Sequence, residues 1–99
     1  MKQILILEIA TLDIVLGQET EYLAAFNQAQ EILTAQKGYI SCEVQRCIDK
    51  PSRFLVMVKW NSLEDHTIGF RESADFTRWR AFVSPFFSSP PDIKHYQLA

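Results

Sequence analysis

The sequence predicts an α+β domain in which strands and helices follow one another in the order β-α-β-β-α-β. Three observations predict it. Apolar residues recur at helical spacing through 22–33, they alternate with polar residues through 39–48 and 53–60, and a short proline-containing turn separates the two alternating stretches. The chain of 99 residues has the size of one domain, 1–99, and shows no internal repeat or linker.

The first strand is expected over 3–14, where isoleucine and leucine dominate. Gly17 and the polar residues after it end this strand and begin a helix. The buried stripe of that helix follows the i, i+3, i+4, i+7 pattern and contains Tyr22, Ala25, Phe26, Ala29, Ile32 and Leu33. Lys37 and Gly38 then supply the basic last turn and the glycine that commonly end a helix.

The stretches 39–48 and 53–60 predict a β-hairpin, with Pro51 in a favoured corner position of its turn. One face of the second strand carries Ile40, Cys42 and Val44, with polar residues between them. One face of the third strand is fully apolar and consists of Phe54, Val56, Val58 and Trp60.

Two serines begin the helical regions of the C-terminal half. Ser62 opens a capping-box sequence that predicts a short helix ending near Arg71, and Ser73 can cap a second helix over 74–87. Pro85 should kink or end that second helix, because proline lacks the backbone donor and clashes with the preceding turn.

A final strand over 93–98 completes the ferredoxin-like order, in which both helices cover one face of a four-stranded antiparallel sheet. A solvated sheet face alternates to polar residues, but the first and third strands are apolar on both sides. The uncovered face would include Leu5, Leu7, Ile9, Leu55 and Met57. Such a patch usually marks an interface, so we expect a homodimer in which a second copy's sheet covers it.

Polar residues share this uncovered face. Glu43, Gln45 and Lys59 are expected on it, whereas Glu8 and His95 fall on one face or the other depending on the register. Since buried charges need partners or water, apolar walls with a few polar groups describe a ligand cavity between the two sheets better than a dry core. The alternative is a structural interface with the acids at its wet rim.

Composition excludes several classes of function. A formal net charge of −2 argues against nucleic acid as a partner. No apolar run approaches the ~20 residues needed to cross a bilayer, and no signal-peptide pattern is present, so we expect no membrane partner and a cytoplasmic location. Cys42 and Cys47 would lie roughly 16 Å apart on one strand, too far for a disulfide, and no Cys-His cluster predicts a metal site.

The stretch Trp-Asn-Ser-Leu-Glu-Asp-His at 60–66 resembles the antibiotic-biosynthesis monooxygenase family of dimeric α/β barrels. The likeness continues through 69–73, Phe76, Trp79 and the closing 90–96, so it spans essentially the whole chain. It implies a homodimer with a pocket in each protomer between sheet and helices. Characterised relatives oxidise quinol or polyketide-like aromatics with molecular oxygen and without metal or flavin, while others in the superfamily isomerise small molecules or degrade haem.

His66 and Arg71 are the candidate catalytic residues. A neutral His66 could take a phenolic proton near neutral pH, and the resulting electron-rich anion could pass an electron to O2, so no cofactor is required. The alternative is an exposed or capping histidine. Arg71 could hold an anionic or carbonyl oxygen of the ligand, or it could pair with Glu64, Glu72 or Asp75.

The candidate substrate-binding residues are Trp60, Glu8, Glu43 and Phe70. Aromatic residues concentrated after the third strand could line a flat substrate, and Trp60, at a strand end, is the better wall candidate, whereas Phe76 and Trp79 are expected in the core. Glu8 and Glu43 could act as a base or a proton relay if burial raised their pKa, or they could lie solvated at a dimer rim. His95 is expected to be structural.

The predicted function is a cofactor-independent monooxygenase that oxidises a small aromatic or quinol-like molecule with O2. Haem is disfavoured, because 76–82 contains no histidine to match the axial ligand of the haem-degrading branch. Two alternatives stay open: a non-catalytic dimeric small-molecule binding or stress-associated protein, and an isomerase that uses the same acid–base groups.

Overall fold

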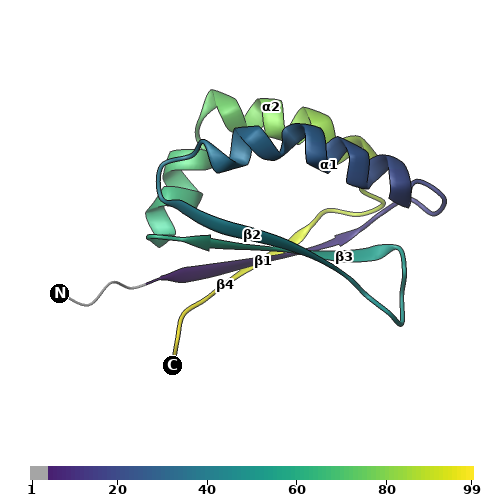
Figure 1. Cartoon of the computed structure of the whole chain (residues 1–99), viewed down its shortest axis with the longest axis horizontal. Coiled ribbons are helices and arrows are strands. Elements are labelled where there is room, and N and C mark those ends of the chain that lie inside the picture. The colour runs from purple at the N-terminus through teal and green to yellow at the C-terminus, as the bar shows by residue number, and fades with distance from the viewer. Residues whose placement is uncertain (1–4) are drawn as a thin grey trace.

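The computed structural model describes residues 5–99 as one antiparallel sheet with both long helices packed on the same face (Figure 1). In chain order the elements are β1 (Ile6–Asp13), α1 (Glu19–Thr34), β2 (Tyr39–Arg46), β3 (Arg53–Trp60), the π-helix η1 (Asp65–Phe70), α2 (Ala74–Val83), the 3₁₀ turn η2 (Ser84–Phe86) and β4 (Asp92–Tyr96). The strand order β2-β3-β1-β4 confirms the predicted ferredoxin-like fold class. No helix within residues 5–99 is long and apolar enough to span a membrane.

The hydrophobic core lies between the sheet and the two helices. The two central strands, β1 and β3, send every second residue into it, and α1 closes it from above with the apolar stripe that its spacing predicts. The largest fully buried side chains are Trp60, Tyr22, Phe54, Ile14, Leu33 and Val58. The opposite face of the sheet is uncovered, and Figure 1 shows the C-terminal end of the chain on that side.

Several predicted boundaries were wrong. The strand β2 ends at Arg46 and not at Ile48. The helix α1 ends at Thr34, before Lys37, and the chain reaches β2 through a separate turn in which Tyr39 N–H donates to the Gln36 carbonyl at 3.2 Å. The helix α2 ends at Val83 because Pro85 diverts the chain into a 3₁₀ turn. The last strand begins at Asp92 and ends at Tyr96.

A β-bulge changes the face that Ile40 occupies. The pairing register shifts between Tyr39 and Ser41, so Ile40 is 41% exposed while Cys42 and Val44 keep the predicted inward face. The predicted first two positions of the first strand, Gln3 and Ile4, lie outside the described residues. Both serine caps were predicted correctly: Asp65 N–H donates to Ser62 Oγ at 3.1 Å, and Phe76 N–H donates to Ser73 Oγ at 3.2 Å.

Gly38 does not end α1, but it fixes the loop that carries η1. Its φ is +83°, and a Cβ built there would collide with the side chain of Asp65 in η1. Its carbonyl also accepts a hydrogen bond from Asn61 N–H at 2.8 Å. We expect Gly38→Ala to lower the free energy of unfolding by ~1–3 kcal/mol, measured by urea denaturation. Gly17→Ala, with a similar φ but open space around it, should cost less, and equal losses would mean that the Asp65 contact is unimportant.

Candidate active site

A cavity of about 460 Å³ lies between the sheet and the helices, within the range of roughly 300–1,000 Å³ typical of small-molecule sites. Its apolar walls come from β1, β3, β4, both helices, η1 and the chain before β4. They include Ala10, Leu12, Val56, Val58, Leu33, Phe70, Phe76, Trp79, Val83, Phe87, Pro91 and Ile93. Its polar groups are Glu8, Tyr22, His66, Arg71 and Arg80. A mostly apolar chamber with a few polar groups is typical of a small-molecule site.

Glu8 lies at the sheet side of this cavity and is buried, with 7% of its surface exposed. Trp60, at the end of β3, donates its indole N–H to Glu8 Oε1 at 2.9 Å. His66 Nε2 lies 3.4 Å from the same oxygen, and the His66 ring stacks on Trp60 with 5.2 Å between ring centroids. The tryptophan therefore holds both the carboxyl group and the imidazole in place.

Burial sets the protonation of this pair. It raises the pKa of Glu8 from 4.5 to about 7, although the Trp60 hydrogen bond and the Arg71 charge act in the opposite direction. Burial also lowers the pKa of His66 to about 4, with His95 and Arg71 adding to the effect. At neutral pH, Glu8 is therefore close to its titration midpoint, whereas His66 is a neutral imidazole.

The π-helix η1 brings His66 and Arg71 to the same cavity. Arg71 N–H donates to the His66 carbonyl at 3.0 Å, the i to i+5 bond of a π turn. In an α-helix, residues five apart would point about 140° away from each other. Arg71 is exposed but lines the cavity, so it stands at its mouth, and its charge lowers the pKa of Glu8 and His66.

His95 extends the polar group toward the surface. It pairs across the sheet with Glu8, and its Nε2 shares a hydrogen bond of 2.8 Å with His66 Nδ1. His95 is only partly buried, and burial together with Arg71 lowers its pKa. Glu8, His66 and His95 thus form a row of polar groups from the cavity outward, in which a hydrogen bond joins the two imidazoles and 3.4 Å separates His66 Nε2 from Glu8 Oε1. Neutral imidazoles can pass a proton by a change of tautomer.

Comparison with known proteins identifies the family. The family described as antibiotic biosynthesis monooxygenase matches residues 5–81. The chain belongs to this family. It is 39% identical to the uncharacterised protein YczJ of Bacillus subtilis strain 168 over 90 residues, which are 91% of this chain and 95% of YczJ.

Solved structures of the same family description agree. A crystal structure from Bordetella bronchiseptica superposes with a TM-score of 0.94 at 33% identity, covering 98% of this chain and 99% of that one. A structure from Nitrosomonas europaea gives a TM-score of 0.82 at 16% identity, covering 98% and 92%, and shows the fold alone. Family membership supports a monooxygenase-like role in general terms and names no substrate.

The antibiotic biosynthesis monooxygenase fold gathers most of the predicted site residues, but not all. Glu8, His66, Phe70 and Arg71 line the cavity. Trp60 does not line it; it lies behind Glu8 and His66, because its indole is fully buried against them.

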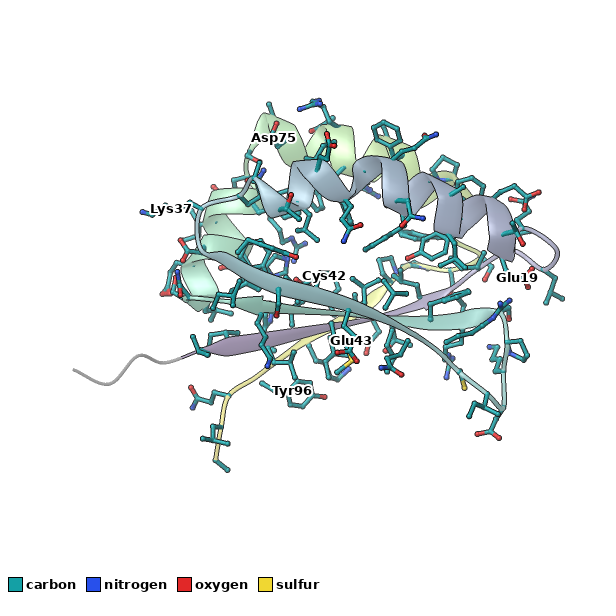
Figure 2. The ribbon with its side chains drawn as sticks, viewed as in Figure 1. Glu19, Lys37, Cys42, Glu43, Asp75 and Tyr96 are labelled. Atoms are coloured by element: carbon teal, nitrogen blue, oxygen red, sulfur yellow. The ribbon has the colours of Figure 1, made fainter. Side chains whose placement is uncertain are left out.

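The expected cavity between the sheets of two copies stays a prediction, because it needs a second chain. The cavity within this chain lies on the helix side, as the family resemblance implies. Glu43 is exposed on the side turned away from the helices, together with Tyr96 (Figure 2). Gln45 and Lys59 are exposed as well, so these polar residues do not line the chamber.

Sequence reasoning missed four features of this family member's site. Phe76 and Trp79 pack on the core, as predicted, but they also line the cavity. Tyr22 and Arg80 line it too, and neither was a candidate. Tyr22 gave a signal that could have been used, since it is the one polar-tipped residue in the buried stripe of the first helix. Nothing in the pattern distinguished Arg80 from an ordinary surface arginine.

Proposed function

We propose that this protein is a cofactor-independent monooxygenase whose substrate is a small hydroxylated aromatic molecule of the quinol type. One observation carries the proposal. A carboxyl group with a pKa of about 7 lies inside an aromatic-lined cavity, next to a neutral imidazole and an arginine. Titratable groups with such shifted pKa values gather at catalytic sites, where a base works best near the ambient pH.

In this proposal Glu8, and not His66, is the base that accepts the phenolic proton. A histidine with a pKa of about 4 holds a proton poorly at neutral pH, whereas half of Glu8 is ionised there and half is protonated. A phenol has an ordinary pKa of ~10, so the anion also needs stabilisation. Arg71 at the cavity mouth supplies a positive charge for it, the role expected of that residue.

His66 and His95 then carry the proton away. Glu8 passes it to His66 Nε2, His66 releases the proton on Nδ1 to His95 Nε2, and His95 exchanges with solvent. This path restores ionised Glu8 for the next proton. It gives His66 the role of a relay held by stacking on Trp60.

The electrons balance without an external reductant. The phenolate gives one electron to O2, and the superoxide and the resulting phenoxyl radical combine to form a C–O bond at a ring carbon that carries part of the unpaired spin. Loss of the proton from that carbon breaks the O–O bond, releases water and leaves a carbonyl. One oxygen atom of O2 ends in the product and the other in water, and the aromatic substrate supplies all the electrons.

We also propose that the working form is a homodimer. The uncovered face of the sheet has an apolar stripe on its two central strands, made of Leu7, Ile9, Leu55 and Met57, with exposed polar residues on β2 and β4 at its edges. An apolar centre with a polar rim is the arrangement of a protein interface. The free thiols of Cys42 and Cys47 are compatible with the cytoplasm as its compartment.

Oxygen consumption tests this function. Purified protein treated with a chelator is mixed with 1,4-dihydroxynaphthalene, and oxygen uptake is compared with that of heat-denatured protein. We expect uptake above the background, with one ¹⁸O atom from ¹⁸O2 in the hydroxyquinone product. A thermal shift by the ligand without uptake would instead favour the non-catalytic binding protein, and isomerised product without uptake would favour the isomerase.

A further inference from the structure

Tyr22 places an unpartnered hydroxyl group at the wall of the cavity. The residue has no exposed surface, lies in the first turn of α1 and lines the chamber. Its Oη is the buried side-chain atom without a hydrogen-bond partner among residues 5–99. Such groups are rare, because a buried hydroxyl normally finds a partner.

Packing fixes where this hydroxyl can point. The Tyr22 ring lies 5.3 Å from the ring of Phe54, and the rings of Phe26 and Phe86 flank it at 6.3 and 6.5 Å. Three aromatic neighbours hold the ring in one orientation, so the hydroxyl has little freedom to turn toward another protein group. Because Tyr22 lines the cavity, a molecule bound there is the candidate partner for this hydroxyl group.

The hydroxyl group is a donor. Burial raises the pKa of Tyr22 above its ordinary value, with the thiol of Cys42 adding to the effect, so the phenol keeps its proton at any physiological pH. The other buried polar groups of the cavity, Glu8 and His66, already have partners. Tyr22 thus needs an oxygen or nitrogen acceptor, which an apolar ligand edge would not supply.

Tyr22 and the Glu8–His66 pair belong to different parts of the chamber. Tyr22 comes from the helix layer and packs on Phe54, which pairs with Leu12. Glu8 belongs to the opposite wall, the sheet, four residues before Leu12 on β1. A ligand whose first oxygen meets Glu8 would therefore present a different edge to Tyr22.

We propose that Tyr22 Oη donates a hydrogen bond to a second oxygen of the ligand, so that the cavity selects aromatic molecules with oxygen atoms on two separate edges. This inference deepens the proposed function and rests on it for the place of the first oxygen. It makes Tyr22 a specificity-determining residue, since a site with a buried donor rejects ligands that leave the donor unpaired.

Binding of two probes without turnover tests the inference. Under anaerobic conditions, 1,4-dihydroxynaphthalene and 1-naphthol differ by one oxygen atom, and their affinities can be measured by quenching of tryptophan fluorescence. We expect the wild type to bind the diol roughly tenfold more tightly than 1-naphthol. Tyr22→Phe should remove this preference by weakening only the diol, and the unliganded variant should be at least as stable as the wild type.

Tyr96→Phe is the matched control, because Tyr96 is exposed on the face away from the helices and its loss of a hydroxyl should leave the preference intact (Figure 2). The inference is overturned if Tyr22→Phe keeps the preference, if it weakens both probes equally, or if the wild type binds neither or shows no preference. Oxygen uptake is measured separately. A Tyr22-dependent preference without any uptake would reject the oxygenase and keep the inference.

Discussion

Replacing Glu8 with glutamine is expected to lower the maximal rate of oxygen uptake by ~10²–10⁴-fold while the fold stays intact. Glutamine has nearly the same shape, and its carbonyl oxygen can still accept the Trp60 N–H, but it cannot take a proton from the substrate. In the wild type the rate should rise with pH through about 7 as Glu8 loses its proton. The residual rate of Glu8→Gln should lack that rise.

The same substitution should stabilise the protein at alkaline pH. The folded pKa of Glu8 is about 7 and the unfolded value is 4.5, so the unfolded state releases its proton first. The contribution of Glu8 to the free energy of unfolding is therefore largest below pH 4.5, and it is lost as the pH rises through about 7. At pH 8 we expect Glu8→Gln to exceed the wild type by ~3 kcal/mol in free energy of unfolding.

Rate profiles and urea denaturation at pH 5 and pH 8 measure both effects. Glu31→Gln, at an exposed position of α1, is the control and should change neither. A variant that loses activity and is equally destabilised at both pH values would show that Glu8 is a structural residue. Full activity in Glu8→Gln would remove the carboxyl group from the mechanism.

Replacing Ile9 with lysine is expected to convert the proposed dimer into a monomer at micromolar concentration. Ile9 lies on the central strand β1, directly opposite Met57 of β3, in the apolar stripe of the uncovered face. A two-fold interface would receive the new charge twice. Two unpaired buried charges at ~2 kcal/mol or more each correspond to at least ~10³-fold in the dissociation constant.

Sedimentation equilibrium of the wild type and the variant measures this effect, and circular dichroism checks that the monomer is folded. Ser41→Lys serves as the control, since Ser41 is an exposed residue of the edge strand β2 and should leave the dimer intact. A wild type that is already monomeric at micromolar concentration would contradict the proposed dimer.

The spacing of apolar residues, together with the glycine, proline and serine residues between the elements, was enough to predict the layers of this fold. The inward residues of β1 and β3 and the stripe of α1 follow directly from alternation and helical spacing. The bulge at Ile40 was not visible, because a single extra residue leaves the local composition unchanged. The end of α1 at Thr34 was also missed. Gly38 has the positive φ typical of a glycine that ends a helix, but here it belongs to the turn between α1 and β2.

The chemistry of the site depended on contacts that sequence spacing does not encode. His66 and Arg71 share the cavity because η1 forms i to i+5 bonds, whereas a helical pattern is read with a period of 3.6. The roles of Glu8 and His66 were not separable from sequence either. Burial sets both pKa values, and the groups that modify them, Trp60 at Glu8 and His95 at His66, are distant along the chain and come into contact only after folding.

The titration of the Glu8 carboxyl group is the most direct measurement of the base that the cavity contains. Its ¹³C chemical shift can be followed by NMR from pH 3 to pH 9 in the wild type, with Glu8→Gln used to assign the signal. A midpoint near 7 is the predicted result, in agreement with burial of the carboxyl group in the chamber. A midpoint near the ordinary 4.5 would mean that Glu8 is solvated and ionised at neutral pH, and the proposed base would then be the wrong residue.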